Sequence, residues 1–393
     1  MKKIRLGDIA TLITKGTTPT TIGFSFVDTG VNFVKIESIS ENGEFLSDKF
    51  AHITDECDNK LKRSQLEEND ILFSIAGAIG RTAIVPRSIL PANTNQALAI
   101  IRIPQNAINL RFVLYALQSQ AVEEQSEKQK QGVAQLNLSL KNIADILIPL
   151  VSSEKQNEIV RNLAAVDAAI AIRKEQIRLI DQVVKSRFIE LFGVYPSNPK
   201  GWETATIRDI VADVRYGSSR PAVDGGKYPY LRMNNITYGG ELDLTDTKHI
   251  DIPDNELDKC TVRRGDVLFN RTNSKELVGK TCVYNRDEMM VLAGFVIRVR
   301  VTERVLPEFL SAFLNTDFSK QMLLGMCKAA IGQANINAQE MQNIGIYLPP
   351  TELQRQFVQF KEQTDKSKYY KSIQILKIIT EAIAKEVSHD RIR

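Results

Sequence analysis

Two long segments of the chain carry apolar residues at alternating steps of three and four, the pattern of an amphipathic helix. The first begins after Pro149, with Ser153 as its N-cap, and ends before Gly193 and Pro196. Its apolar positions are Ile159, Leu163, Val166, Ile170, Ile177, Ile180, Val184, Phe188 and Leu191. These steps form a heptad seam with one skipped position, which predicts a helix that packs against another helix.

The second such segment begins after Pro350, with Thr351 as N-cap, and is more polar at its centre, where Thr364 and Ser367 occupy the seam. Its apolar positions are Phe357, Phe360, Ile373, Leu376, Ile379, Ile383 and Val387. At about 1.5 Å per residue, roughly 38 residues give a rod of about 57 Å. A helix of that length without a partner is unstable, so we expect the two helices to pair.

The order of the two helices in the chain predicts their relative direction. The first helix leads from the first globular segment to the second. A second helix that lies beside it must therefore run back, and we expect an antiparallel pair. A helical spacer within some other kind of two-domain protein is the alternative that the periodicity leaves open.

The segments that precede the two helices repeat each other at an offset of about 200 residues, too long a period for a solenoid. The strongest match joins Asn69-Asp70-Ile71-Leu72-Phe73-Ser74 to Gly265-Asp266-Val267-Leu268-Phe269-Asn270. Further matches in the same order join residues 6–9 to 207–210, 80–85 to 279–284, 132–137 to 332–337, and 149–156 to 349–354. The chain therefore consists of two copies of one unit, and each copy is a domain followed by a long helix.

Within each copy, short β-rich runs such as residues 71–75 and 267–270 alternate with turns rich in glycine and asparagine. We predict an α+β protein in which two similar domains are separated by a pair of long antiparallel, coiled-coil-like helices, with a pseudo-twofold axis relating the copies. The predicted parts are a domain at residues 1–151, a helix at 152–193, a domain at 194–350 and a helix at 351–393.

Composition narrows the class of protein only slightly. The net charge of +4, from 51 basic and 47 acidic residues, does not by itself indicate a nucleic-acid binder. No apolar run approaches the length of a membrane span, and no signal core follows the basic N-terminus, so we expect a cytoplasmic protein without a membrane partner. The four cysteines form no C-x-x-C pair and there are three histidines, so we expect reduced thiols and no metal site.

Motifs of catalysis are missing from the sequence. There is no Asn-Pro-Pro-Tyr or Asp-Pro-Pro-Tyr run, and no Glu-x-Lys follows Pro253-Asp254. Gly279-Lys280-Thr281 resembles the end of a phosphate loop, but Ser274 stands where that motif needs a glycine. Residues 76–80 do not match G-x-G-x-x-G. We therefore expect a chain that is not an enzyme.

Several loops concentrate short polar and cationic side chains that could contact DNA, since hydroxyls and cations meet phosphates while amides and guanidinium groups read bases. The candidates are Lys15, Thr17, Thr18, Thr20, Lys35, Ser74, Arg81, Asn93, Asn95, Gln96, Arg215, Tyr216, Ser218, Ser219, Arg220, Arg232, Asn234, Asn235, Asn270, Arg271, Asn273 and Lys275. For each loop alone, a solvated turn is the more common explanation. However, the framework runs repeat while loops such as residues 74–77 and 270–273 differ, as two copies of one scaffold that read different sequences should.

The chain resembles the specificity subunits of type I restriction–modification systems over essentially its whole length. The resemblance rests on the order of domain, long helix, domain, long helix, and on the duplicated runs that begin at Leu6, Asn69, Gly265 and the two prolines before the helices. It implies a non-catalytic chain whose two target-recognition domains each read one half of a bipartite, asymmetric target in double-stranded DNA.

The resemblance also implies the partners. The helices would set the spacer between half-sites and dock two copies of an adenine-N6 methyltransferase (M) subunit, which binds S-adenosylmethionine. Restriction/translocase (R) subunits would complete the complex, and this chain itself would hold no cofactor.

Two other kinds of function stay open on the sequence. A self-contained methyltransferase–nuclease would be active alone with S-adenosylmethionine. A protein-binding adaptor would lack duplex binding that strengthens as salt falls.

Overall fold

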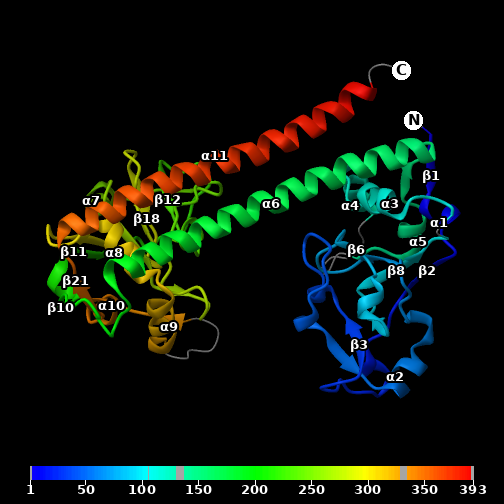
Figure 1. Cartoon of the computed structure of the whole chain (residues 1–393), viewed down its shortest axis with the longest axis horizontal. Coiled ribbons are helices and arrows are strands. Elements are labelled where there is room, and N and C mark those ends of the chain that lie inside the picture. Colours follow the sequence, from blue (N-terminus) through cyan, green and yellow to red (C-terminus); the bar gives the residue numbers. More distant parts are fainter. Residues whose placement is uncertain (1, 105, 130–136, 328–333, 391–393) are drawn as a thin grey trace. The chain divides into compact units, whose positions relative to one another are not determined.

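The computed structural model describes residues 2–104, 106–129, 137–327 and 334–390, without the side chains of 375, 376 and 378–390. Contacts divide the chain into two compact units, residues 1–168 with 382–393, and residues 169–381. The long helix α6 (Ser153–Phe192) begins in the first unit and ends in the second (Figure 1). The units thus divide inside α6, and the domain boundaries drawn from the sequence stay a prediction.

In the first unit, a four-stranded antiparallel sheet has the order β2-β8-β5-β6, and a three-stranded sheet has the order β4-β3-β7. The strands of the larger sheet are β2 (Leu12–Lys15), β8 (Leu98–Arg102), β5 (Ile71–Ser74) and β6 (Thr82–Ile84). Those of the smaller sheet are β4 (Ala51–Ile53), β3 (Val31–Val34) and β7 (Ala92–Thr94). A further pair joins β1 (Lys3–Arg5) to β9 (Leu147–Pro149). The helices before α6 are α1 (Leu6–Ile9), α2 (Asp55–Lys60), α3 (Leu110–Leu117), α4 (Gln120–Gln129) and α5 (Leu140–Ala144).

The second unit repeats this topology, which confirms the duplication. Its larger sheet has the order β11-β19-β15-β17, and its smaller sheet has the order β13-β12-β18-β14. The strands are β11 (Val211–Tyr216), β19 (Val296–Val301), β15 (Val267–Asn270), β17 (Thr281–Val283), β13 (Lys248–Ile250), β12 (Tyr228–Leu231), β18 (Met290–Leu292) and β14 (Thr261–Val262). Two further pairs are β10 (Glu203–Thr206) with β21 (Gly345–Leu348), and β16 (Thr272–Asn273) with β20 (Ala334–Asn335). The helices are α7 (Asp254–Cys260), α8 (Pro307–Leu314), α9 (Asp317–Met326), α10 (Ala338–Gln342) and α11 (Thr351–Asp390).

The aspartate of the strongest repeated motif anchors each larger sheet. Asp70 is buried, accepts a hydrogen bond from the Glu67 N–H at 2.7 Å and pairs with Arg102 of β8 at 2.8 Å. Asp266 does the same with the Arg263 N–H at 2.9 Å and with Arg300 at 2.8 Å. A buried carboxylate is costly unless it is paired and hydrogen-bonded, so aspartate and arginine recur together in both copies.

The glutamine of the repeated Glu-x-Gln run fixes the start of each long helix on its domain. Gln156 is buried, accepts a hydrogen bond from the Asn109 N–H at 3.0 Å and donates to the Val151 carbonyl at 2.9 Å. Gln354 likewise accepts from the Leu306 N–H at 2.8 Å and donates to the Pro349 carbonyl at 2.8 Å. One amide thereby satisfies two backbone groups near the helix start that burial would otherwise leave unpaired.

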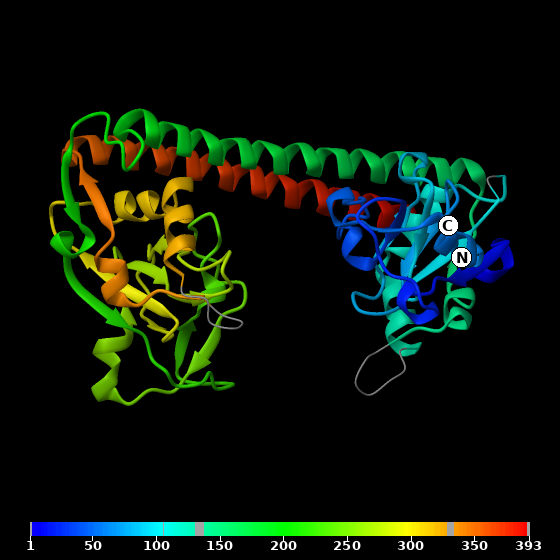
Figure 2. The same cartoon turned by 90° about the horizontal axis from the view of Figure 1, so that it is seen from below.

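In the second unit, α6 and α11 lie side by side and antiparallel (Figures 1 and 2). The ring of Phe357 contacts Phe188 and Phe192, with centroids 5.3 and 5.7 Å apart. Arg187 lies over the ring of Phe360 at 5.9 Å. Farther along, the ammonium of Lys368 is 2.6 Å from the carboxylate of Asp181, and that of Lys371 is 3.2 Å from the amide oxygen of Gln176. Residue numbers fall along α6 as they rise along α11, so the two helices run antiparallel within this unit.

The polar centre of α11 has a structural explanation. Lys368 is mostly buried and pairs with Asp181 of α6 and with Glu241 of the second domain. Burial alone would lower the pKa of Lys368, but its hydrogen bonds to the two carboxylates outweigh burial and leave that pKa raised. Charge pairing therefore replaces apolar packing at this level of the helix pair.

Most predicted seam positions of α6 are half-buried in the structure, namely Ile159, Leu163, Val166, Ile170, Ile177, Ile180 and Val184. Phe357 is fully buried and Phe360 is half-buried. Ile373 departs from the prediction with 41% of its surface exposed, because the contacts of α11 with α6 pass through Lys368 and Lys371 instead. The side chains of Leu376 and Ile383 lie outside the described residues.

No helix within the described ranges is both long and apolar enough to span a membrane.

The ring cluster between the helices predicts a large effect of one truncation. Phe357→Ala removes a fully buried ring that contacts both Phe188 and Phe192. We therefore expect the free energy of unfolding to fall by about 3–5 kcal/mol. The matched control is Phe360→Ala, whose half-buried ring should contribute less. Chemical denaturation of the intact chain measures both, and equal losses would contradict the central role of Phe357.

Candidate nucleic-acid interface

Three strand ends lie next to one another at one end of each larger sheet, which we call the loop end. In the second unit, β11 ends at Tyr216, which pairs with Ile297, and β15 ends at Asn270, which pairs with Val296. The residues at this end are therefore Tyr216, Arg271 and Phe295. Predicted contact residues from separate loops meet here because antiparallel strands bring their ends together.

Register assigns the equivalent positions in the first unit. Lys15 pairs with Ala99, and Ser74 pairs with Leu98. The loop end of the first unit therefore carries Lys15, Ile75 and Ala97, where the second unit carries Tyr216, Arg271 and Phe295. The same three backbone positions thus carry one cation and two aliphatic side chains in one copy, and one cation and two aromatic side chains in the other.

A glycine lets the chain cross the smaller sheet at each loop end. A Cβ atom on Gly16 would lie 1.8 Å from the Thr94 carbonyl oxygen, and one on Gly217 would lie 2.2 Å from the Leu292 carbonyl oxygen. Only glycine allows backbones to approach this closely. The repeated Lys15-Gly16-Thr17 and Tyr216-Gly217-Ser218 runs therefore owe their glycine to packing.

The side chains at the second loop end are held by well-defined contacts. The guanidinium of Arg271 lies over the ring of Tyr216 at 5.0 Å, and the Tyr216 hydroxyl accepts a hydrogen bond from the Ala338 N–H at 2.9 Å. The Arg271 N–H donates to the Phe295 carbonyl at 3.0 Å, and the Arg271 carbonyl accepts from the Ile336 N–H at 2.9 Å. Tyr216 and Phe295 remain 44% and 51% exposed. The backbone of Arg271 is therefore fixed by hydrogen bonds, while the rings of Tyr216 and Phe295 are partly exposed to solvent.

Arg271 differs from the other predicted arginines in its partners. Arg215 pairs with Asp213 at 2.9 Å, Arg220 with Glu256 at 2.7 Å and Arg232 with Asp246 at 2.8 Å. The guanidinium of Arg81 donates to the Ile39 carbonyl at 2.7 Å. The Nε atom of Arg271 is buried without a partner, and its terminal amino groups form no hydrogen bond or ion pair with any described residue. Its charge is therefore available to a ligand.

Other predicted residues surround the loop end of the first unit. Lys15 is exposed and has no ion pair within the described ranges. The Thr18 hydroxyl donates to the side chain of Gln96, which is exposed, and the Asn95 side chain accepts from the Ala97 N–H at 3.1 Å. These residues offer a cation, an amide and a hydroxyl at one surface.

Several predicted contact residues are buried in the fold. Asn93 donates to Asp58 at 2.8 Å and accepts from Ser64 at 2.7 Å, while Asn235 donates to the Asp243 carbonyl at 2.9 Å. The other buried members are Ser74, Ser218 and Asn270. The side-chain atoms of Asn270 are buried without partners, whereas those of Ser74 are hydrogen-bonded. Asn93, Asn235 and Ser74 thus form hydrogen bonds within the fold, and contact of all these buried residues with DNA stays a prediction.

The remaining predicted residues are spread over the surface of each unit. Lys35 pairs with Glu37 at 3.0 Å, and the Asn273 side chain accepts from the Ser274 N–H at 2.8 Å. Thr20, Ser219, Asn234 and Lys275 are exposed, and Thr17 is half-buried. The structure does not gather all of these with the loop ends.

Sequence reasoning missed Phe295, because a single phenylalanine before a strand gives no signal without its register. It also missed a lysine cluster in the second unit. Lys280 is buried and donates to the Met233 carbonyl at 2.9 Å, the equivalent of the bond from Arg81 to the Ile36 carbonyl. Lys320 donates to the Gly279 carbonyl at 2.9 Å. Burial, with the nearby charges of Lys280 and Lys185, lowers the pKa of Lys320 to about 8.

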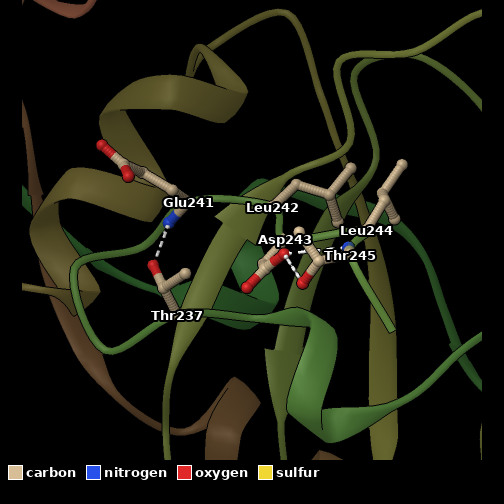
Figure 3. Close-up of a pocket in the computed structure, with 6 residues that line it drawn as sticks. All are labelled: Thr237, Glu241, Leu242, Asp243, Leu244 and Thr245. Atoms are coloured by element: carbon tan, nitrogen blue, oxygen red, sulfur yellow. Dashed lines mark hydrogen bonds between the residues drawn. The ribbon is translucent and has the colours of Figure 1, made fainter. Parts of the chain in front are cut away.

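The chemistry of the described residues offers little else that could bind a ligand. No cluster of three or more histidine, cysteine or acidic residues among them could hold a metal ion. The cysteines are free, and burial raises the pKa of the Cys282 thiol to about 12, so this thiol stays protonated. A shallow hollow at residues 237–245 of the second unit has polar groups that bond to one another, Thr237 to the Glu241 N–H and Asp243 to Thr245 (Figure 3).

Fold and loop ends together define a class of protein with two copies of one α+β unit, each followed by a long helix and carrying different side chains at equivalent positions of the loop end. The family described as "Type I restriction modification DNA specificity domain" matches residues 1–182 and again residues 199–380. The chain belongs to this family.

Relatives and a solved structure agree with that assignment. The chain is 23% identical over 326 residues to the type I restriction enzyme EcoKI specificity subunit of Escherichia coli (strain K12), covering 78% of the chain and 70% of the relative. It is 35% identical over 136 residues to the EcoBI specificity subunit of Escherichia coli, covering 34% of the chain and 28% of the relative. A structure solved to explain complex assembly and conformational transition of the type I R-M system has the same fold, with a TM-score of 0.55 at 18% identity over 98% of this chain and 95% of that one.

The lowered pKa of Lys320 predicts how stability depends on pH. Below pH 8 the folded chain holds a charged ammonium in a buried place, which is unfavourable. Between about pH 8 and 10.5 the folded chain has lost this proton while the unfolded chain keeps it, so the Lys320 contribution to stability rises with pH. Lys320→Met lacks this titration. We expect wild type to gain stability relative to the variant across that range in denaturation at several pH values, and a constant difference would contradict the assignment.

Proposed function

We propose that this chain is the non-catalytic specificity subunit of a type I restriction–modification complex, in which each recognition domain reads one half of a bipartite, asymmetric DNA target. The observation that carries the proposal is the pair of loop ends, where Lys15, Ile75 and Ala97 in one copy stand at the positions of Tyr216, Arg271 and Phe295 in the other. One backbone with two sets of side chains suits the recognition of two different base sequences.

The helices suit the role of a spacer. At about 1.5 Å per residue, the 40 residues of α6 extend for about 60 Å. Two half-sites one turn apart in the duplex are separated by about 34–36 Å. The helix is therefore long enough to place two recognition domains on successive major grooves, and we propose a pseudo-twofold arrangement of the two copies.

The exposed side of α6 supports the docking of partner subunits. Ile172, Leu179 and Val183 are exposed apolar residues at helical spacings of seven and four, so they lie on one face. We propose that this face contributes to the binding of M subunits. Two M subunits would supply S-adenosylmethionine and flip the target adenine out of the duplex, and R subunits would join the same core.

The deciding experiment is co-expression with the partner methyltransferase subunit in a host that lacks adenine methylation, followed by genome-wide mapping of N6-methyladenine. We expect one split motif, with two short specific blocks around a spacer of fixed length. Methylation by this chain alone would indicate a self-contained enzyme. A chain that binds neither the M subunit nor duplex DNA would support the adaptor alternative.

The spacer role predicts the effect of a longer helix pair. A four-residue helical insertion after Gln176 in α6, matched by one after its partner Lys371 in α11, lengthens both helices by about 6 Å. Since base pairs stack about 3.4 Å apart, we expect the methylated motif to keep both blocks and gain about one or two spacer base pairs.

The matched control is an insertion in α11 alone, which shifts the helix pair out of register without lengthening α6. It should lower methylation without producing a new fixed spacer. If the double insertion is active and leaves the spacer unchanged, the helices do not set the half-site distance.

A further inference from the structure

We infer that the loop end of the second unit recognises a guanine followed or preceded directly by a thymine, through Arg271 and Phe295. This inference rests on the proposed function and adds to it the bases that one recognition domain selects.

Arg271 is pre-oriented for bidentate recognition. Its backbone is fixed on both sides, by hydrogen bonds to Phe295 at 3.0 Å and from Ile336 at 2.9 Å. Its guanidinium lies on the Tyr216 ring, whose hydroxyl is itself fixed by the Ala338 N–H. A planar guanidinium that stacks on a ring and has free terminal amino groups matches the O6 and N7 acceptors of guanine in the major groove.

Arg271 does not have to leave an ion pair before it binds DNA. Arg220 and Arg215 each donate to a carboxylate and would have to leave it to reach a base. Arg271 has no acidic partner within the described ranges, and its buried Nε atom has no acceptor. Its interaction with guanine would therefore replace solvent contacts only.

Phe295 supplies an apolar group at the adjacent position. Its ring is 51% exposed, belongs to none of the core clusters and makes no ring contact with another described residue. Neighbouring strands are about 4.8 Å apart, and successive base pairs are about 3.4 Å apart. A side chain one strand away from Arg271 can therefore contact the next base pair, where the 5-methyl group of thymine is the apolar feature of the major groove.

The first unit cannot make the same pair of contacts. Ile75 stands at the position of Arg271 and is almost completely buried, while Ala97 stands at the position of Phe295. Its cation is Lys15, a point charge without the fork of a guanidinium. Guanine–thymine recognition should therefore be confined to one half-site.

The test begins with the methylation motif of the complex and asks which half changes when Arg271 is replaced. Arg271→Ala should relax discrimination at one guanine of one block by about tenfold or more, with the other block unchanged. Arg264→Ala is the matched control, because it removes the same charge from an exposed arginine of the same unit that is paired with Asp287 at 2.7 Å and is not among the predicted contact residues. It should leave the specificity of both blocks intact.

The thymine is tested with deoxyuridine, which removes the 5-methyl group and keeps base pairing. Replacing the thymine beside the Arg271-dependent guanine should weaken binding of the wild-type complex about fourfold, the effect of one buried methyl group. The same replacement should have no effect on the Phe295→Ala complex, and none when made in the other block. Circular dichroism checks that Phe295→Ala, a change at an exposed ring, stays folded.

Failure of this inference and failure of the proposed function give different results. A split motif whose Arg271-dependent block lacks an adjacent guanine and thymine, or a wild-type complex indifferent to deoxyuridine there, overturns this inference and leaves the proposed function intact. Failure of the complex to methylate any specific sequence overturns the proposed function and this inference with it.

Discussion

A helix of 40 residues is stable in water only where its apolar side is covered, and the architecture of this protein follows from that constraint. In the second unit, α6 and α11 cover each other around Phe357, which is buried between Phe188 and Phe192. The same cluster includes Phe309 of α8, so the helix pair and the domain share one core. The direction of α6 and α11 in this unit is therefore set by packing with the domain as well as by the seam.

Polar anchors complete this arrangement and explain why motifs recur in both copies. Gln156 and Gln354 tie each helix start to backbone groups of its domain, and the ion pairs of Asp70 and Asp266 hold each larger sheet. All four side chains are buried, where a polar group without a partner costs about 1–3 kcal/mol. After the duplication, surface residues of each copy could be substituted independently. The four buried side chains could be substituted only together with their partners.

Residues at the loop ends differ between the copies although the strand pairing there is alike. Ile75 is almost completely buried where its counterpart Arg271 is half-buried, and Ala97 stands where Phe295 is half-exposed. A duplicated frame with different side chains at its ends is the physical basis that we propose for the recognition of two sequences by one chain. The family to which the chain belongs is described by DNA specificity, which agrees with this division between frame and ends.

The sequence by itself determined the duplication, the two long helices, and the strands at residues 71–74 and 267–270, because these depend on local periodicity and on runs that repeat in order. The predicted N-caps were wrong by one residue, since Ser153 and Thr351 are already helical and Ser152 accepts the capping hydrogen bond of α6 from the Lys155 N–H. It also placed Tyr216 and Arg271 among the candidates. Only the tertiary structure decided that Asn93 and Asn235 are internal, that Arg215, Arg220 and Arg232 are paired with carboxylates, and that Phe295 lies beside Arg271. Composition cannot distinguish a polar side chain that satisfies its own fold from one that is free for a ligand. That distinction depends on strand register and on partners distant in the chain.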